Sequence, residues 1–282
     1  MSVDLLQEKI RKTKNPGVLV LEADLALLPA EYTGMEGLRA YCGALLEGLQ
    51  GLVPAVRFGF GGFALENGLD TLAALTRQAR ALGYYVILDG PEILSAQAAE
   101  HMAATLGGAE CPWAWDTLVV SPWVGSDAVK PFLPLCKEGK ALLCAVRTGN
   151  RSAAQLQDLL SGSRLTHTAA ADIVTRHGEA LLGKYGYSHL GALAPAGSAD
   201  CLRSLRSKYS RLFLLVDGYD YSFGNSKNCA QAFDKLGHGA AVCAGSSITA
   251  AWQENADKTP VEAAREAAEK MKKNLLRHIT VL

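Results

Sequence analysis

Short apolar runs alternate along the chain with longer stretches in which apolar residues recur at helical spacing. Each run is continuous, as is typical of strands that are covered on both faces. Between residues 34 and 50, for example, Leu38, Tyr41, Leu45 and Leu49 share one face of a helix. The predicted strands are 17–22, 52–57, 84–89, 117–121, 141–147, 189–194, 212–217 and 239–244. The predicted helices are 1–16, 34–50, 67–82, 95–106, 127–137, 153–160, 167–185, 199–208, 227–236 and 261–276.

This alternation predicts an α/β fold, a single (β/α)8 TIM barrel. A chain of 282 residues is the size of such a barrel. A doubly wound open sheet is the main alternative, but no Gly-x-Gly-x-x-Gly follows the first predicted strand. No linker or shift in composition divides the chain, so we expect one domain over residues 1–282.

Composition narrows the function classes. The chain is 49% hydrophobic, enough for a large core without disulfides or metal. Its 28 basic and 28 acidic residues balance, which argues against a nucleic-acid groove. We find no secretory signal and no apolar run of the roughly 18 residues that cross a bilayer, so we expect a soluble cytoplasmic protein. The cysteines form no Cys-x-x-Cys pair and the histidines lack metal spacing, so we expect no metal site.

Polar side chains recur where the predicted strands end. In a barrel these ends converge on one mouth, where active sites sit. Each residue taken alone is more typical of a loop cap or a surface charge, and their recurrence is what favours a site. The most informative stretch is 84–92, in which an apolar run ends at Asp89 and a Gly-Pro turn leads to Glu92. The strand-end residues are Glu22, Arg57, Asp89, Ser121, Arg147, Asp217 and Ser246.

Motifs spread over nearly the whole chain carry a family resemblance. They are Leu27-Leu28-Pro29 and the segments 119–132, 145–150, 155–159, 186–188 and 232–234. Together they resemble the orotidine 5′-phosphate decarboxylase family in its longer bacterial form. The resemblance implies a (β/α)8 barrel that needs no cofactor. It also implies a homodimer, since the family usually has two sites at its dimer interface.

The chemistry-bearing positions of this family match poorly. The family carries Asp-x-Lys-x-x-Asp after the third strand; here the first Asp is Asp89, but Pro91 holds the Lys position and Leu94 the last acidic one. The family's phosphate-binding Ser-Ser-Arg becomes Ser246-Ser247 followed by Ile248. The family's Gln in the loop after the seventh strand has no clear match in residues 219–221.

These departures remove specific chemistry. Decarboxylation leaves a carbanion that needs a nearby cation and then a proton, and lysine supplies both whereas proline supplies neither. Arg57 stands where the family has a Lys after the second strand, and Glu22 where it has an Asp. An arginine brings positive charge but is a poor proton donor, because its pKa exceeds about 12. Losing the phosphate arginine removes a charge-assisted bidentate contact.

Three hypotheses stay open. The first is a diverged family member that binds a small anionic or nucleotide-like ligand, with decarboxylase activity lost or altered. The second is a non-catalytic dimeric or partner-binding pseudoenzyme whose mouth is filled by Phe58, Phe60 and Trp123. The third is a working decarboxylase, converting orotidine 5′-phosphate to uridine 5′-phosphate and CO₂ through atypical residues. The candidate catalytic residues are Asp89, Arg57 and Glu22; the candidate substrate-binding residues are Ser121, Arg147, Asp217, Gly218, Ser246 and Ser247, with Tyr219, Tyr221 and Phe223 packing over a ring.

Overall fold

The computed structural model describes residues 2–220, 224–255 and 257–281. Eight parallel strands close into a barrel in the order β1-β10-β9-β8-β5-β4-β3-β2, which confirms the predicted (β/α)8 fold. The barrel strands are β1 (Gly17–Leu21), β2 (Ala55–Gly59), β3 (Tyr85–Asp89), β4 (Thr117–Val120), β5 (Ala141–Ala145), β8 (Leu190–Pro195), β9 (Leu214–Asp217) and β10 (Ala240–Ala244). The short strands β6 (Leu160–Ser161) and β7 (Arg164–Leu165) pair separately as a hairpin.

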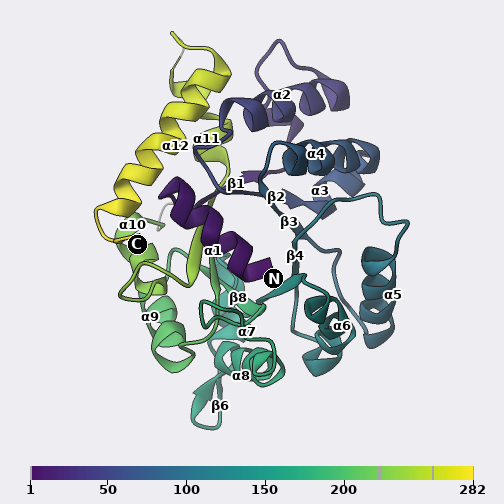
Figure 1. Ribbon diagram of the computed structural model, residues 1–282, viewed down its shortest axis with the longest axis vertical. Coiled ribbons are helices and arrows are strands. Elements are labelled where there is room, and N and C mark those ends of the chain that lie inside the picture. The colour runs from purple at the N-terminus through teal and green to yellow at the C-terminus, as the bar shows by residue number, and fades with distance from the viewer. Residues whose placement is uncertain (1, 221–223, 256, 282) are drawn as a thin grey trace.

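Helices surround the barrel, as Figure 1 shows. The longer ones are α1 (Ser2–Thr13), α2 (Gly34–Gly48), α4 (Leu69–Ala81), α5 (Ala96–Gly107), α8 (Thr166–Gly178), α9 (Ala199–Lys208) and α12 (Pro260–Leu276). The shorter ones are α3 (Phe60–Leu65), α6 (Leu133–Lys137), α7 (Ala154–Gln157), α10 (Ser226–Cys229) and α11 (Ser246–Thr249). Single 3-10 turns are η1 (Leu25–Leu27), η2 (Gly125–Ala128), η3 (Lys130–Phe132), η4 (Arg151–Ala153), η5 (Ala230–Ala232) and η6 (Ala251–Glu254). Among the described residues, we find no helix with the length and apolar character needed to cross a membrane.

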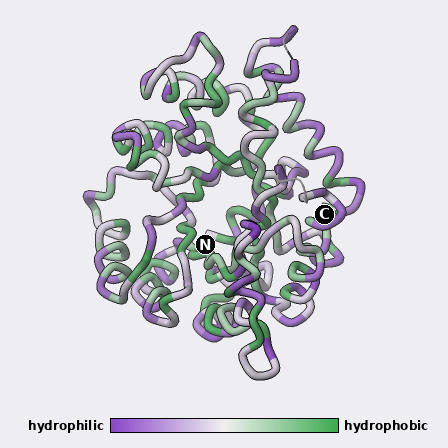
Figure 2. The backbone as a smooth tube through the Cα atoms, turned by 180° about the vertical axis from the view of Figure 1, so that it is seen from behind, coloured by the Kyte–Doolittle hydropathy of each residue, from purple (hydrophilic) through white to green (hydrophobic). Residues whose placement is uncertain are grey.

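Buried apolar residues form two layers because successive strand residues point to opposite faces. Val18 and Val20 of β1 face the barrel interior, whereas Leu19 and Leu21 pack outward against the helices. Figure 2 shows the result along the chain, with hydrophobic segments gathered centrally and hydrophilic ones on the periphery. This alternation also decides which side chains at the strand ends can reach the mouth.

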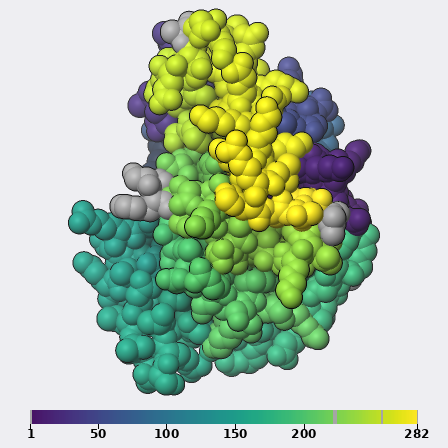
Figure 3. All heavy atoms as spheres, turned by 90° about the vertical axis from the view of Figure 1, so that its left-hand side faces the viewer, coloured from purple at the N-terminus to yellow at the C-terminus, as the bar shows by residue number. Residues whose placement is uncertain are grey.

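Helix α1 covers the N-terminal end of the barrel. It crosses the centre of the view in Figure 1, and it lies at the right edge of Figure 3, while α12 crosses the face turned toward the viewer. Val3, Leu6 and Ile10 are buried in the same apolar cluster as the interior strand residues. Because α1 covers this end of the barrel, we expect a ligand-binding site at the other end, where the carboxyl ends of the strands meet.

Strand β2 begins later than the sequence pattern predicts. Pro54 has no N–H to give to a ladder, and the strand runs from Ala55 to Gly59 instead of ending at Arg57. Arg57 therefore sits in the middle of the strand and points into the barrel. Phe58, the next residue, points outward and packs on Phe63, with 6.5 Å between the ring centroids.

Four predicted helices are shorter or more broken than expected. Segment 127–137 forms η2, η3 and α6, since Pro131 and Pro134 remove helical donors. Segment 153–160 is helical only as α7, because the chain then turns at Gly162 (φ +66°) into the β6–β7 hairpin. Segment 167–185 ends its helix at Gly178 before a turn at Gly186 (φ +80°). Segment 227–236 contains only α10 and η5.

Candidate functional site

Arg57 lies at the centre of the mouth and is fully engaged with two carboxylates. Its Nε donates to both oxygens of Asp89 at 2.8 and 3.0 Å, and its Nη2 donates to Asp89 Oδ2 at 2.7 Å. Its Nη1 donates to Asp217 Oδ1 at 2.6 Å. Burial disfavours the charged guanidinium, but Asp89 and Asp217 outweigh this and hold the pKa of Arg57 well above its usual value. The group is a fixed cation whose charge is already balanced.

Glu22 follows β1 and extends over the neighbouring strand β2. A Cβ on Gly59 would collide with Glu22 Oε2, so the absence of a side chain at Gly59 creates the space for this carboxylate. Part of Glu22 is open to the cavity, yet protein atoms crowd its carboxyl group. Burial, followed by the charge of Asp89, raises the pKa of Glu22 to about 7, against the opposing effect of Arg57. Glu22 can therefore exchange a proton near neutral pH.

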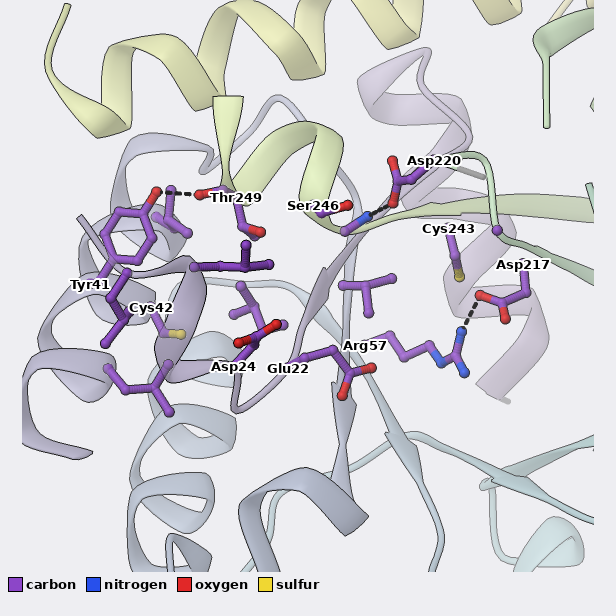
Figure 4. Close-up of a pocket in the computed structure, with 18 residues that line it drawn as sticks. Glu22, Asp24, Tyr41, Cys42, Arg57, Asp217, Asp220, Cys243, Ser246 and Thr249 are labelled. Carbon is purple, nitrogen blue, oxygen red and sulfur yellow. Dashed lines mark hydrogen bonds and ion pairs between the residues drawn. The ribbon is translucent and has the colours of Figure 1, made fainter. Parts of the chain in front are cut away.

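A third acidic side chain, Asp220, meets the segment that follows β10. It belongs to the turn after β9, where Gly218 has φ +80°. The Gly245 N–H donates to Asp220 Oδ2, and the Ser247 hydroxyl donates to Asp220 Oδ1. Figure 4 shows the first of these bonds, with Asp220 turned toward the start of α11. Both oxygens of this carboxylate thus have donors from one short segment.

These groups border a cavity of about 380 Å³ over the carboxyl ends of β9, β10, β1 and β2. One side is acidic and the other is apolar, and Tyr41 donates to the Thr249 carbonyl at 2.6 Å on the apolar side (Figure 4). Among the described residues that line the cavity, Arg57 is the one basic side chain. The acidic lining residues are Glu22, Asp24, Asp217 and Asp220, and the apolar side includes Leu27, Leu28, Leu38, Tyr41 and Leu45. The cavity suits a small molecule with an apolar part and a polar end.

The structure brings most of the sequence-predicted site residues together. Glu22, Arg57, Asp217, Gly218 and Ser246 line the cavity, Asp89 holds Arg57, and Ser247 holds Asp220.

Two of the predicted residues lie elsewhere. Arg147 does not line the cavity, because its guanidinium forms two bonds to Asp158 at 2.9 and 2.8 Å. Ser121 follows β4 and also lies outside the lining. Of the aromatic residues proposed to pack over a ring, Tyr219 packs against the core; Tyr221 and Phe223 fall outside the described residues.

The aromatic residues expected to plug the mouth do not line the cavity. Phe58 points into the outer layer, and Phe60 packs on Trp113 with 5.2 Å between ring centroids. Trp123 donates its indole N–H to the Ala145 carbonyl at 3.1 Å, beside β5. This part of the pseudoenzyme hypothesis is wrong for the described cavity, because strand alternation and neighbouring contacts turn these rings away.

Sequence reasoning missed Asp24, Asp220 and Tyr41 as lining residues. Asp24 and Asp220 come two and three residues after the predicted strand-end residues Glu22 and Asp217, so extending the search into each loop would have found them. Tyr41 lies on α2 and reads as a core residue from its spacing. Its place at the cavity depends on how α2 packs beside the loop after β1.

Comparison with known proteins identifies the family of this chain, although no family model matches it. Over 209 residues the chain is 30% identical to an orotidine 5′-phosphate decarboxylase from Rhodopirellula baltica, covering 72% of this chain and 69% of that protein. The chain belongs to the orotidine 5′-phosphate decarboxylase family.

Solved structures of similar shape show the fold. An orotidine monophosphate decarboxylase candidate from Toxoplasma gondii superposes with a TM-score of 0.80 at 18% identity, covering 97% of this chain and 98% of that one. The orotidine monophosphate decarboxylase of Leishmania donovani gives a TM-score of 0.72 at 22% identity, covering 98% and 100%. The barrel is thus shared nearly end to end with proteins of low sequence identity.

Within this family, the structure shows where the altered positions lie. Pro91 follows β3 in an irregular turn, and Leu94, which the sequence resemblance aligns with the family's last acidic position, is 85% exposed. Ile248, which the sequence resemblance aligns with the family's phosphate arginine, is 1% exposed and packs into the outer core. None of the three offers a polar side-chain atom to the cavity.

Proposed function

We propose that this family member binds a small nucleotide-like molecule at the barrel mouth and no longer decarboxylates orotidine 5′-phosphate. The observation that supports this most strongly is the pairing of Arg57 with both Asp89 and Asp217. It is the one basic side chain of the described lining, and its charge is already balanced. Among the described residues that line the cavity, no cation is therefore left unpaired for a carboxylate or a developing carbanion.

Ligand binding is supported by the cavity itself. Its apolar side can cover a ring, and its carboxylates can accept hydrogen bonds from hydroxyl or amine groups. The anionic ligand expected from sequence fits this lining less well than a neutral one, because an anion would face four carboxylates. A ligand with several hydroxyl groups, such as a nucleoside, uses this lining best.

The direct test is incubation of the purified protein with orotidine 5′-phosphate while the ultraviolet absorbance of the substrate is followed. We expect no turnover above the uncatalysed rate, with an active family enzyme as the positive control. In parallel, thermal-shift screening of nucleosides, nucleotides and small acids tests binding. We expect at least one nucleoside-like compound to raise the melting temperature, and substitution Asp217→Asn to weaken that shift. A complete absence of shifts would contradict the binding proposal.

A working decarboxylase is the second candidate, and Glu22 is the observation that favours it. With a pKa raised to about 7, this carboxyl group could deliver a proton that the missing lysine cannot. If turnover of orotidine 5′-phosphate is found, this alternative predicts that Glu22→Gln abolishes it. Retention of full turnover in that variant would exclude Glu22 as the proton donor.

We also propose that the protein forms a homodimer, as the family resemblance implies. Large apolar side chains follow the carboxyl ends of β2 to β5, on the half of the mouth away from the cavity. We call them the apolar rim: Leu65, Leu94, Trp123, Val124 and Leu156, of which Leu65 and Leu94 are 86% and 85% exposed. Such exposure is explained if a second copy covers it.

The dimer is tested by light scattering after size-exclusion chromatography. We expect twice the mass of one chain for the native protein and a monomer for Leu94→Glu. The control Leu236→Glu, at a 50% exposed leucine outside the apolar rim, leaves the mass unchanged. A native monomer would contradict the proposal.

A cytoplasmic location and the absence of a cofactor stay predictions.

A further inference from the structure

The segment after β10 offers two donors that converge on a single point at the mouth. They are the backbone N–H of Gly245 and the hydroxyl of Ser247, and both donate to the carboxylate of Asp220. The donors and the acceptor lie far apart in sequence, since Asp220 and Gly245 are separated by 25 residues. These two donors, which together could bind an anion, are therefore occupied by the carboxylate of Asp220.

The sequence resemblance aligns the same segment with the phosphate-binding Ser-Ser-Arg of the family, with Ser246 and Ser247 kept. The third position contributes nothing polar here, because Ile248 is buried in the outer core. A phosphate bound here would be repelled by the Asp220 carboxylate, which already occupies the two donors. It would also lack a guanidinium contact at position 248. Glu22, Asp24 and Asp217 border the same cavity and add to the repulsion.

We propose that Asp220 is a specificity-determining residue that excludes phosphate from the mouth. The ligand that this site accepts then carries no phosphate group, so it belongs to the nucleoside class rather than the nucleoside monophosphate class. The nucleoside part of this statement rests on the proposed function. The exclusion of phosphate rests on the position of Asp220 and on the acidic lining around it, and does not depend on the nucleoside assignment.

The backbone around Asp220 holds its carboxylate in place. Tyr219 N–H donates to the Cys243 carbonyl at 3.3 Å, which ties the turn to β10. The Tyr219 side chain packs against the outer core, and Ala196 N–H donates to the Asp217 carbonyl at 2.7 Å on the other side. The turn that carries Asp220 is thus tied to both neighbouring strands. An incoming phosphate would have to displace the Asp220 carboxylate from the two donors.

The test measures binding of inorganic phosphate, uridine and uridine 5′-phosphate by calorimetry to the full-length protein. The variants are Asp220→Asn, which removes the charge with little change in size, and Asp220→Ala, which frees both donors. The matched control is Asp24→Asn, which makes the same change of charge in the same cavity lining without touching Gly245 or Ser247.

We expect the native protein to bind uridine at least about tenfold more tightly than uridine 5′-phosphate. In Asp220→Ala, phosphate and uridine 5′-phosphate should bind at least about tenfold more tightly than in the native protein, because two donors to a charged group become free. Asp220→Asn should give part of this gain in affinity. Asp24→Asn should raise the affinity for phosphate by less than about threefold. Circular dichroism and urea unfolding verify that each variant is folded. If Asp220→Ala does not fold, the phosphate affinity of Asp220→Asn tests the proposal instead.

Two results would overturn the proposal: Asp220 variants that bind phosphate no more tightly than the native protein does, or an equal gain in phosphate affinity in Asp24→Asn. Failure of the proposed function has a different signature. In that case uridine binds to none of the proteins, while the inorganic phosphate measurements still report on Asp220.

Discussion

The two ends of the barrel handle polar groups in opposite ways. At the N-terminal end, Ser2 Oγ lies 2.5 Å from the Tyr85 hydroxyl and donates to the Asp116 carbonyl at 2.8 Å. The Tyr85 hydroxyl also contacts Thr117 Oγ1 at 2.5 Å. These are neutral groups in a mainly apolar setting. At the mouth, Asp89 and Asp217 bind the guanidinium of Arg57, and Glu22, Asp24 and Asp220 line the same cavity.

This difference between the two ends shows that the chain gathers its excess negative charge at the mouth. At the covered end, the neutral bonds of Ser2 and Tyr85 stabilise the docking of α1 without adding buried charge. The same helix buries one carboxylate, Asp4, which lies 4.0 Å from His189 Nε2. The mouth gathers like charges, which is unfavourable for folding and is typical of positions kept for binding. Substitutions at the two ends should therefore differ in size and in their dependence on pH.

The largest effect is expected for Arg57→Ala. The substitution leaves the carboxylates of Asp89 and Asp217 without their cation in a poorly solvated place, and removing one partner of a buried pair costs about 3–5 kcal/mol. Urea unfolding at pH 7 measures this loss. Lowering the pH to 5 should reduce it, because the freed carboxyl groups then take up protons more readily.

Two variants control this experiment. Arg203→Ala removes an exposed arginine paired with Asp200, and we expect less than about 0.5 kcal/mol. Combining Arg57→Met with Asp89→Asn and Asp217→Asn should recover most of the stability lost by Arg57→Met alone, since no charge is then left unpaired. If the triple variant is as unstable as Arg57→Met, the loss arises from packing and not from charge.

At the covered end, Leu6→Ala is expected to lower the free energy of unfolding by about 3 kcal/mol. Leu6 is 1% exposed between α1 and the barrel interior, and a leucine removed from such a place leaves a cavity. Leu5→Ala, at a 39% exposed neighbour on the same helix, should change it by less than about 1 kcal/mol. Ligand affinity at the mouth should be the same in both variants, and a change in Leu6→Ala alone would couple the two ends.

Sequence reasoning captured the fold better than the site, for physical reasons. Strands covered on both faces read as continuous apolar runs, so the eight barrel strands were predictable. The direction of a side chain depends on the pairing register, and in the closed barrel Arg57 pairs with the inward-facing Val20 and Phe58 with the outward-facing Leu21. The bonds from Gly245 and Ser247 to Asp220 join two loops that only the closed barrel brings together. No local spacing could have predicted them.

A smaller effect is expected for Tyr85→Phe, which keeps the ring and removes the hydroxyl shared with Ser2 and Thr117. Ser2 retains its bond to the Asp116 carbonyl, so we expect a loss of about 1–2 kcal/mol in unfolding free energy. A double-mutant cycle with Thr117→Val isolates the pair. Independent, additive losses would show that this contact contributes little to the covered end.

The smallest effect, and the one most specific to the mouth, is expected for Glu22→Gln. Because the pKa of Glu22 is raised from 4.5 to about 7 in the folded protein, the unfolded chain releases this proton at a lower pH than the folded one does. Below about pH 4.5 the carboxyl is protonated in both states, and native protein and variant should be equally stable in this respect. As the pH rises from 4.5 to 7, the native protein should become progressively less stable than Glu22→Gln, and above pH 7 the difference should level off. Solvent in the cavity screens the charge, so we expect a difference of less than about 1 kcal/mol at pH 8, measured by urea unfolding across the pH series. A difference that is constant from pH 4 to pH 8 would mean that Glu22 titrates normally, and the two ends of the barrel would then differ in charge but not in proton affinity.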